Sequence, residues 1–595
     1  MCGIFTLLND YETFDKSIIQ HEFNKGQNRG PEFSKLDYSY LKMVLGFHRL
    51  AINGLNNESN QPLVIDNVVL ICNGEIYNYK ELYKTMKVIP KTDSDCEVII
   101  HLYIKYGMEQ TLIMLDGVFS FVLFDNRITN DLNNQLYIAR DPYGVRPLYQ
   151  IKRKSLKENN IMTTGMDNFN LYGFASELKC LEHFYNNNSE QYTITQFTPG
   201  TYSIFNLSSM VSSVWEPVEL NKPYFTPNFS YTIFADCYEP FYNFIKESKL
   251  NIELDNHKKM QQEITLETLH DIISLSLRIA VHKRCLTTER PIACLLSGGL
   301  DSSLIAALVT EYYKEPNKEL ETYSIGLKDS EDLKYAKIVA EWIGSKHTEI
   351  IVTEKEMFDA IPEVIYAIES YDTTTIRASI GNYLLGKYIS KNSDAKVIFN
   401  GDGSDELFGG YLYMNQCPDD IEFDKESRRL LKDIHLFDVL RSDKSISTNG
   451  LEPRTPFLDK NFVNSILSIP PYYRNHKNFN KIEKSLLRDS FKNDKILPDI
   501  ILNRKKEAFS DGVSSQGRSL YTILQELIAL HLNIEQPNKK YEANIETEKY
   551  YYKSIFDKHF SNCSHILPYF WMPKYTDATD PSARTLNFYL ENTTN

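Results

Sequence analysis

The pattern of apolar residues changes once along this chain, between residues 206 and 265, and that change constrains the fold more than any other feature. Before it, short β-rich runs are separated by turn residues, and one helix is predicted. The runs span residues 44–52, 68–77, 117–125, 135–141 and 172–177, and the helix spans residues 97–106. Strands therefore dominate the first part of the chain.

Beyond the change, short apolar strands alternate with helices, which predicts a parallel sheet covered by helices. The strands are expected at residues 292–296, 322–326, 347–352 and 396–400, and the helices at residues 266–285 and from Ser302 onward. Residues 206–265 are rich in Asn, Tyr and Pro without clear periodicity, which indicates a partly ordered linker. Because one hydrophobic core stops growing at about 250–300 residues, we expect two domains in this chain of 595, at residues 2–205 and 266–575.

Composition and charge disfavour several classes of protein. The net charge of −14 argues against binding to nucleic acid or to anionic membranes. Nine cysteines without paired C-x-x-C spacing indicate reduced thiols rather than a disulfide or zinc framework. No apolar run approaches the ~20 residues that cross a bilayer, and the first residues lack the pattern of a signal peptide. We therefore expect a cytoplasmic protein without nucleic-acid or membrane partners.

The second residue is a candidate nucleophile. Removal of Met1 would leave Cys2 with a thiol and a free α-amine on the same residue. An α-amine titrates at about pH 7.7–8.0 and a free thiol at about 8.5, so the amine can accept the thiol proton at neutral pH without a histidine. The start of the chain is therefore a candidate active site.

The run SGGLDSS, residues 297–303, lies between a predicted strand and a predicted helix and has the features of a phosphate-binding loop. Gly298 and Gly299 allow the backbone to approach an anion, and the start of the helix presents unpaired N–H groups. The hydroxyls of Ser297, Ser302 and Ser303 add further donors. The loop lacks the lysine of GxxxxGK[ST], which favours adenylation with pyrophosphate as the leaving group over transfer of the γ-phosphoryl group.

A second polar run, NGDGSDELFGGY, follows the strand expected at residues 396–400. Ligands of parallel sheets bind beyond the carboxyl ends of the strands, so Asp402, Asp405 and Glu406 are expected to face the phosphate loop. With Asp301 they would hold Mg²⁺. Cations that could bind a substrate carboxylate or pyrophosphate are Arg377, Arg454, Lys505 and Lys506.

Taken in order, these motifs resemble the family of glutamine-hydrolysing asparagine synthetases over nearly the whole chain. MCGIF, RGPE, HRLAI, NGEIYNY and SDCEVI resemble its class II glutamine amidotransferase domain. SGGLDSS, TTTIRAS, NGDGSDELFGGY, EPRTPFLD, KIEKSLLRDSF and RKKEAFSDGV resemble its ATP-pyrophosphatase domain. The resemblance implies an α+β Ntn-hydrolase αββα sandwich, followed by an α/β parallel-sheet ATP-pyrophosphatase domain.

For the first site, the resemblance implies hydrolysis of glutamine to glutamate and ammonia. Cys2 would attack the amide with its own α-amine as the base, and Asn73 and Gly74 would form the oxyanion hole. Arg49 would bind the α-carboxylate of glutamine, and two acids would bind its α-ammonium group. The full implied glutamine site consists of Arg49, Leu50, Ile52, Asn73, Gly74, Glu75 and Asp95.

For the second site, the resemblance implies that the β-carboxylate of aspartate attacks ATP to give β-aspartyl-AMP and pyrophosphate, and that ammonia arriving through an internal channel then displaces AMP. ATP and pyrophosphate would contact Leu295, Leu296, Ser297, Gly298, Gly299, Asp301, Ser302, Ser303, Ile325, Asn400 and Gly401. Mg²⁺ would bind Asp301 and Asp405, aspartate would bind Thr374 and Arg377, and Asp402 and Lys506 would be catalytic. The family also suggests a homodimer.

The chain departs from the family pattern at a few positions. Asp402 stands where many members carry Glu, Asn400 replaces Ser, and Glu32 replaces Asp. Residues 150–170 and 206–265 exceed compact relatives in length and are expected to be surface loops. Two alternatives stay open: an enzyme of this architecture that amidates another carboxylate or closes a ring, and a non-catalytic glutamine or ATP sensor. The intact Cys2 argues against ring closure, and a sensor would be expected to lose its nucleophile or phosphate loop.

Overall fold

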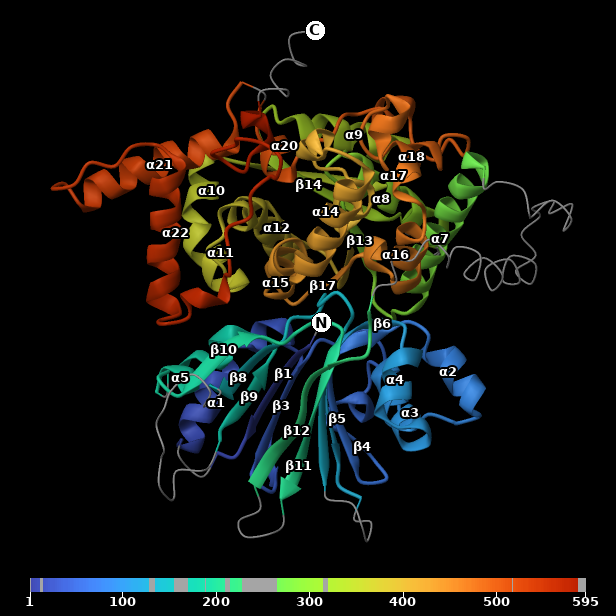
Figure 1. Ribbon diagram of the computed structural model, residues 1–595, viewed down its shortest axis with the longest axis vertical. Helices are drawn as coiled ribbons and strands as arrows, with labels where there is room; N and C mark the ends of the chain where they lie inside the picture. The colour runs from blue at the N-terminus through green and yellow to red at the C-terminus, as the bar shows by residue number, and fades with distance from the viewer. Residues whose placement is uncertain are drawn as a thin grey trace, which may run out of the picture.

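The computed structural model describes residues 2–10, 14–127, 134–154, 170–187, 189–208, 214–226, 265–313, 319–515 and 517–586. These residues form two domains, one built on antiparallel sheets and one on a parallel sheet, and the start of the chain lies where the two meet (Figure 1). The switch in apolar pattern therefore marks a real change of architecture.

The N-terminal domain contains two antiparallel six-stranded sheets. The first has the order β10-β8-β9-β1-β3-β2 and the second β12-β11-β7-β6-β5-β4. The first sheet comprises β1 (Gly3–Leu8), β2 (Phe33–Tyr40), β3 (Met43–Arg49), β8 (Tyr149–Arg153), β9 (Tyr172–Ala175) and β10 (Tyr192–Gln196). The second comprises β4 (Leu63–Ile65), β5 (Val68–Ile76), β6 (Gly117–Asp125), β7 (Gln135–Arg140), β11 (Thr201–Ser208) and β12 (Val214–Pro223).

The two sheets face each other, and helices cover their outer faces (Figure 1). The helices are α1 (Lys16–Asn24) and α5 (Glu182–Asn186) beside the first sheet, and α2 (Tyr79–Met86), α3 (Val98–Tyr106) and α4 (Met108–Met114) beside the second. Alternate residues of a strand point to opposite faces. In β1, Phe5 and Leu7 accordingly pack in the cluster that contains α1 and α5, whereas Ile4 and Leu8 pack between the sheets. Strands buried on both faces explain the continuous apolar runs of the sequence.

Part of the segment expected to be a linker belongs to the second sheet. Strand β12 pairs antiparallel with β11, so the chain up to Pro223 is held in the N-terminal domain. Residues 227–264, which complete the expected linker, and residues 155–169 of the other long segment lie outside the described residues. The predicted helix at residues 97–106 is observed as α3, one residue shorter at its start.

The C-terminal domain is built on a parallel five-stranded sheet with the order β15-β14-β13-β16-β17. Its strands are β13 (Ile292–Leu295), β14 (Glu321–Leu327), β15 (Lys346–Val352), β16 (Val397–Phe399) and β17 (Glu452–Arg454). The parallel sheet and the four predicted strands are confirmed. A fifth strand, β17, is formed by the first three residues of the run EPRTPFLD. From β13 the chain passes to β14 on one side and later to β16 on the other. Such a switch point is where parallel sheets bind ligands.

Helices surround this sheet and extend beyond it. They are α7 (Leu266–Leu286), α8 (Leu300–Tyr312), α9 (Glu331–Ile343), α10 (Glu354–Asp359), α11 (Ile361–Ile368), α12 (Thr373–Asn392), α13 (Ser404–Phe408), α14 (Asp420–Asp433), α15 (Asp438–Ser447), α16 (Lys460–Leu467), α17 (Pro471–Arg474), α18 (Ser485–Asp489), α19 (Asp499–Leu502), α20 (Phe509–Gly512), α21 (Leu520–Glu535) and α22 (Ile545–His559). The helix expected at residues 266–285 is α7, and the helix expected from Ser302 begins two residues earlier as α8.

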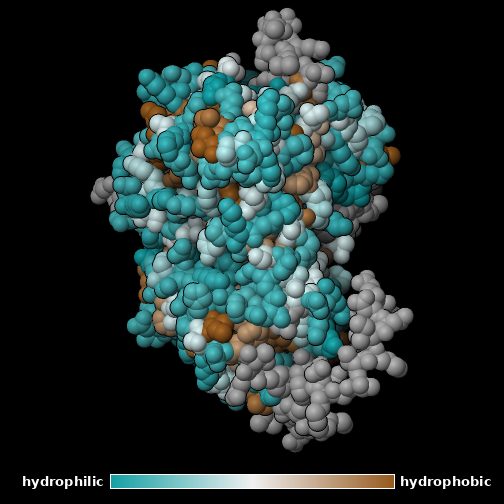
Figure 2. All heavy atoms as spheres, turned by 90° about the vertical axis from the view of Figure 1, so that its left-hand side faces the viewer, coloured by the Kyte–Doolittle hydropathy of each residue, from teal (hydrophilic) through white to brown (hydrophobic). Residues whose placement is uncertain are grey.

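The domains share buried apolar clusters. Leu50 and Ile52 of the N-terminal domain belong to the same cluster as Leu269 and Leu277 of α7. The surface differs from this interior: on the face in Figure 2, hydrophilic residues predominate and apolar atoms form small, separate groups. Within the described parts of the chain, no helix has the length and apolar character to span a bilayer, and the cysteines are free thiols.

Candidate active sites

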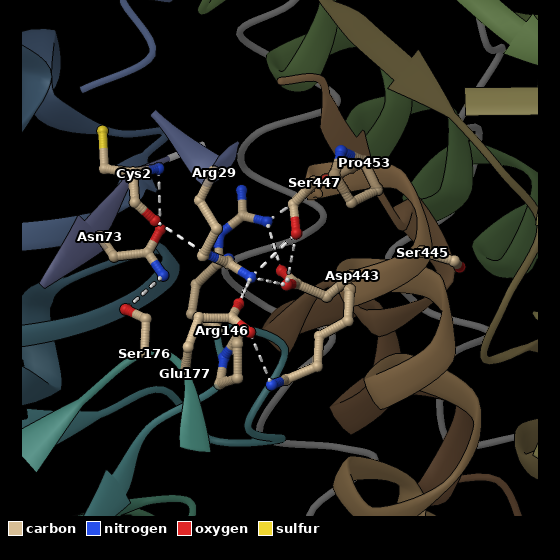
Figure 3. Close-up of polar contacts among 12 residues, drawn as sticks. Cys2, Arg29, Asn73, Arg146, Ser176, Glu177, Asp443, Ser445, Ser447 and Pro453 are labelled. Atoms are coloured by element: carbon tan, nitrogen blue, oxygen red, sulfur yellow. Dashed lines mark hydrogen bonds and ion pairs between the residues drawn. The ribbon is translucent and has the colours of Figure 1, made fainter. Parts of the chain in front are cut away.

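Cys2 lies at the buried start of β1, at the boundary between the domains (Figure 3). Its backbone nitrogen donates a hydrogen bond to Asn73 Oδ1 at 3.2 Å, and its Sγ lies 3.7 Å from the carbonyl oxygen of Leu50. Burial raises the pKa of the Cys2 thiol, while the nearby N-terminal charge and Arg49 act to lower it. Removal of Met1 would turn the nitrogen of Cys2 into an amine, which would then be available as a base for this buried, protonated thiol.

Asn73 and Gly74 are consecutive residues of β5, and Asn73 contacts Cys2. While Asn73 Oδ1 accepts from Cys2, its Nδ2 donates to Ser176 Oγ at 3.3 Å, which leaves one of the two amide hydrogens available. Gly74 is required by close packing, since an added Cβ would lie 2.7 Å from the carbonyl oxygen of Val118. The pair therefore combines an unused side-chain donor with a backbone N–H, the arrangement that stabilises an oxyanion.

Arg49 ends β3 and is enclosed by carbonyl oxygens of the following loop. Its Nη1 donates to Asn56 O at 2.9 Å and to Asn60 Oδ1 at 2.6 Å, and its Nη2 donates to the carbonyls of Asn53 and Gly54. Burial lowers the pKa of Arg49. Among the described residues, no carboxylate lies at ion-pair distance to offset this effect. A cation held by neutral acceptors is suited to bind the carboxylate of a ligand.

Glu75 and Asp95 are two buried carboxyl groups whose charges act on each other. Asp95 Oδ2 accepts from the backbone nitrogen of Ile76 at 2.7 Å, and burial raises its pKa to about 6. Burial and the charge of Asp95 raise the pKa of Glu75 well above its usual value. When both acids are ionised, their negative charges repel each other, and a bound ammonium group would offset this repulsion.

The second site is a cavity of about 170 Å³ beyond the carboxyl ends of β13 and β16. Of the residues proposed from the sequence, its lining includes Leu295, Leu296, Ser297, Gly299, Asp301, Ser302, Ile325, Thr374, Asn400, Gly401, Asp402, Asp405, Lys505 and Lys506. Gly298, Ser303, Arg377 and Glu406 are not part of the lining. Residues from five separate segments of the sequence therefore meet at the switch point of the sheet.

The phosphate-type loop occupies one wall of this cavity, directly before α8. Gly298 has φ +73°, and a Cβ there would lie 2.4 Å from the backbone nitrogen of Ala336, so only glycine fits. The hydroxyls of Ser297 and Ser302 bond to each other at 2.9 Å, and Gly299 is the N-cap of α8. The positive end of α8 thus points to the cavity together with two adjustable hydroxyl groups.

Two carboxylates and two lysines form the charged centre of the cavity. Lys484 Nζ lies 2.6 Å from Asp301 Oδ2 and 2.5 Å from Asp405 Oδ1, and Lys506 Nζ lies 2.7 Å from Asp405 Oδ2. Burial alone would raise the pKa of Asp405, but the charges of both lysines bring it below its usual value. Lys484 was not singled out from the sequence, although it lies in the quoted run KIEKSLLRDSF; that run alone says nothing about which way its lysines point.

The carboxylates of Asp301 and Asp405 also fit the binding of Mg²⁺. Asp301 Oδ1 is buried and accepts no hydrogen bond from the described residues, so a carboxylate oxygen is free at this point. Mg²⁺ is commonly held by one or two carboxylates together with substrate phosphates. No group of three or more His, Cys, Asp or Glu with the geometry of a metal site occurs in the described parts of the chain. Asp301 and Asp405 therefore fit a site that a nucleotide completes, not a site formed by protein alone.

Asp402 lines the same cavity and is bonded to α15. Arg441 Nη2 contacts Asp402 Oδ1 at 3.0 Å, and burial raises the pKa of Asp402 although Arg441 partly offsets the effect. Glu406 points elsewhere, because its Oε1 accepts from the hydroxyl of Tyr411 at 2.7 Å. Of the three acids in NGDGSDE, two reach the cavity, since α13 turns the third to a different side.

Two arginines occupy positions that differ from the sequence-based expectation. Arg377 is buried between two carboxylates: it lies 2.6 Å from Glu548 Oε2 and 2.7 Å from Asp580 Oδ1. Its charge is thus paired by the C-terminal part of the chain. Arg454 points to the N-terminal domain, with Nη2 3.4 Å from Glu75 Oε2 and 2.9 Å from Glu452 Oε1. Thr374 does line the cavity, and its buried Oγ1 has no partner among the described residues.

Comparisons with known proteins match both halves of the chain. The model of a glutamine amidotransferase domain matches residues 1–216, and that of asparagine synthase matches residues 273–421 and 415–579. The glutamine-hydrolysing asparagine synthetase of Cricetulus griseus is 39% identical over 607 residues, that of Gallus gallus 40% over 601, and that of Homo sapiens 38% over 607. Each alignment covers 99% of this chain and 99% of the relative.

Proposed function

The chain belongs to the family of glutamine-hydrolysing asparagine synthetases, and from this premise we propose which of its residues carry the reaction. It is a ligase that hydrolyses glutamine, activates aspartate with ATP and transfers the released ammonia to form asparagine. The observation that supports the residue assignment is the contact between Cys2 and Asn73: the nitrogen of Cys2 donates to Asn73 Oδ1, and the Asn73 amide keeps one N–H beyond the one donated to Ser176.

We assign glutamine hydrolysis to Cys2 in its processed form. The α-amine takes the thiol proton, the sulfur attacks the amide carbon, and the oxyanion that forms is stabilised by Asn73 and Gly74. The amine returns the proton to the leaving nitrogen, so ammonia departs and a thioester remains. Water then hydrolyses the thioester, which releases glutamate and regenerates the thiol. Each oxyanion donor contributes about 2.7–4 kcal/mol to lowering such a barrier.

The substrate's zwitterionic end is matched by charge. Arg49 binds the α-carboxylate: its N–H groups, which now donate to oxygens of the following loop, donate to the substrate oxygens instead. Glu75 and Asp95 accept the α-ammonium group, which favours their ionised forms and relieves the cost of burying them together. Leu50 and Ile52, which are buried beside Arg49, form the apolar wall.

We assign aspartate activation to the cavity at the switch point. The backbone of Leu295, Leu296, Ile325 and Gly401 binds the adenosine portion, and the loop at residues 297–303 binds pyrophosphate at the start of α8. Lys484 and Lys506 neutralise charge on the leaving group. Asp301 and Asp405 would hold Mg²⁺, which would supply positive charge to offset that of the phosphates. Asp402, which also lines the cavity, assists proton transfer during the attack of ammonia.

Aspartate binding is assigned differently from the sequence-based expectation. Thr374 offers an unpartnered hydroxyl to the cavity, so it remains a proposed aspartate ligand. Arg377 is already paired with Glu548 and Asp580, and we propose that it fastens the C-terminal segment behind the cavity wall. Lys505 and Arg441, which also line the cavity, are the cations that we propose for the carboxylate groups of the acceptor.

We also propose a fold family, a cellular location, domain boundaries and an oligomeric state for this protein. The four-layer N-terminal domain with a nucleophile at the start of its first strand is typical of Ntn hydrolases. Free thiols throughout the described residues agree with a cytoplasmic protein. We also propose that the N-terminal domain extends to about residue 226 and that the C-terminal domain starts with α7. A homodimer is proposed from membership of the family alone.

The experiment that tests this function follows asparagine, glutamate, AMP and pyrophosphate together, with ATP, Mg²⁺, aspartate and glutamine present. The parent protein is expected to form all four products, and Cys2→Ala only asparagine, AMP and pyrophosphate when ammonium replaces glutamine. Glutamine-dependent synthesis by Cys2→Ala would contradict the assignment of the nucleophile. Glutamate without pyrophosphate from the parent would point to a different carboxylate acceptor.

A further inference from the structure

A cluster of charged side chains is buried between the two domains, beside Cys2 (Figure 3). The N-terminal domain contributes Arg29, Arg146 and Glu177, and helix α15 of the C-terminal domain contributes Asp443 and Lys444. All five side chains are at least nine-tenths buried. Burying so many charges is costly unless each is paired, and charge pairs of this kind fix geometry rather than add stability. The cluster therefore calls for a role in positioning.

Arg29 connects the nucleophile residue to α15. Its Nε donates to the carbonyl oxygen of Cys2 at 3.0 Å, while its Nη1 lies 2.8 Å from Asp443 Oδ1 and 2.9 Å from Ser447 Oγ. The same Nη1 contacts Glu177 Oε1 at 2.8 Å. A guanidinium group is planar and rigid, so its anions set the direction in which its remaining N–H points. The position of the Cys2 carbonyl therefore depends on side chains of the other domain.

Asp443 is placed to set that direction from the C-terminal domain. Its Oδ1 contacts Arg29 and its Oδ2 contacts Arg146 Nη1 at 3.3 Å, so one carboxylate spans two arginines of the N-terminal domain. Arg146 makes a further contact with Glu452 at 3.6 Å. Because Arg29 and Arg146 would repel each other without an anion between them, the charge of Asp443 matters more than its volume.

Helix α15 also reaches the second active site. Two residues before Asp443, Arg441 contacts Asp402 at 3.0 Å, and the hydroxyl of Ser442 accepts a hydrogen bond from Asn400 Nδ2 at 2.5 Å. Residues two apart on an α-helix point to nearly opposite sides. One turn of α15 is therefore bonded on one side to the cavity that binds ATP and on the other to the residue that holds Cys2.

We propose that Asp443 is a positioning residue for glutamine hydrolysis, which acts by holding Arg29 against the Cys2 carbonyl and thereby ties the nucleophile to the helix that carries Arg441. This inference rests on the proposed role of Cys2 as the nucleophile. It requires no change in the synthetase reaction itself, since Asp443 does not line the ATP cavity. Loss of its charge displaces the Cys2 carbonyl, and a displacement of about 1 Å at a reacting group can cost about 100-fold in rate.

The test compares Asp443→Asn and Asp443→Glu with Ser445→Ala as the matched control. Ser445 is buried on the same helix, points away from the cluster in Figure 3, and donates to the carbonyl oxygen of Arg441. We expect Asp443→Asn to lower kcat/KM for glutamine hydrolysis about 10- to 100-fold. Ammonia-dependent asparagine synthesis should stay within about twofold of the parent in all three variants, as expected for sites that are not in contact.

The order of the two Asp443 variants separates positioning by charge from simple packing. If the carboxylate holds Arg29, Asp443→Glu retains more glutaminase activity than Asp443→Asn, although asparagine is the better match in size. The reverse order, or parental activity in Asp443→Asn, would overturn the proposal. Parental activity in Ser445→Ala is the result expected for the control, and a matching loss there would also overturn it.

Two further variants separate the proposed role of Asp443 from damage to the domain and from a wrong assignment of the nucleophile. If Asp443→Asn loses ammonia-dependent synthesis as well, the domain has been damaged, and Ser447→Ala then decides, because it removes one uncharged partner of Arg29. A selective loss of glutamine hydrolysis in Ser447→Ala supports the proposal, and unchanged hydrolysis overturns it. Cys2→Ala tests the underlying function separately: continued glutamine hydrolysis in that variant would refute the nucleophile assignment whatever the Asp443 variants show.

Discussion

Replacing Arg377 by methionine tests whether this arginine binds the acceptor or fastens the C-terminal segment. The guanidinium group is bonded on two edges: Nε and Nη2 contact the carboxylate of Glu548, and Nη1 and Nη2 contact that of Asp580. Although burial acts against its charge, these two acids raise the pKa of Arg377 well above its usual value. Methionine keeps the apolar stem of the side chain but leaves both acids buried without their cation.

The size of the effect follows from these contacts. Removing one partner of a buried ion pair typically costs about 3–5 kcal/mol. That cost shifts the equilibrium for detachment of the C-terminal segment by about 150- to 5,000-fold, at about 1.4 kcal/mol for each factor of ten. Where detachment leads to unfolding of the domain, the thermal midpoint falls on the order of 5–10 °C. Ser582 and Arg584 still hold the segment through Asp511 and the carbonyl oxygen of Ser515, so part of its attachment remains in this variant.

The assay combines limited proteolysis of the segment after α22 with the kinetics of ammonia-dependent synthesis. Lys387→Met is the control, because Lys387 lies on the same helix α12 but forms an exposed pair with Glu363 at 2.9 Å. Such surface pairs contribute about 0–1 kcal/mol. We expect faster cleavage and a lower thermal midpoint for Arg377→Met only. Parental protease resistance together with a selectively raised KM for aspartate would refute this reasoning and return Arg377 to the acceptor site.

Three other outcomes follow from the two sites. Asn73→Ala should lower kcat for glutamine hydrolysis about 100- to 1,000-fold and leave ammonia-dependent synthesis unchanged; a loss below tenfold, measured as glutamate release, would argue against an oxyanion role. Burial raises the pKa of Asp95 to about 6, so the acid is ionised above that pH and becomes neutral below it; KM for glutamine should therefore rise as the pH falls from 7 to 5. Asp95→Asn should weaken this dependence without abolishing it, because the pKa of Glu75 is also raised. Lys484→Met, which leaves Asp301 and Asp405 with Lys506 as their remaining cation among the described contacts, should lower pyrophosphate release about 100-fold with glutamine hydrolysis preserved, and an unchanged rate would remove Lys484 from the phosphate site.

Local sequence patterns predicted the architecture and the residues at the centres of both proposed sites. The change from short strands to alternating strands and helices predicted the two domains, because side-chain period and turn residues act within a few positions of the chain. Cys2 and the loop at residues 297–303 were identifiable for the same reason, since their chemistry lies in adjacent residues. The acids Asp301 and Asp405 followed from their places after two parallel strands, whose carboxyl ends share one edge of the sheet.

Tertiary structure alone decided which partner each buried charge finds. Arg377 pairs with acids 171 and 203 residues away, and Arg454 reaches the other domain, although both stood in motifs that suggested substrate contact. Lys484 and Asp443 carried no local signal, because their roles arise from side chains that distant segments bring within 3 Å. The second sheet likewise takes in β12, which has no clear period of its own, since pairing with β11 supplies its hydrogen bonds. A local pattern specifies what an element is, whereas the partner of a long polar side chain depends on the packing of the whole chain.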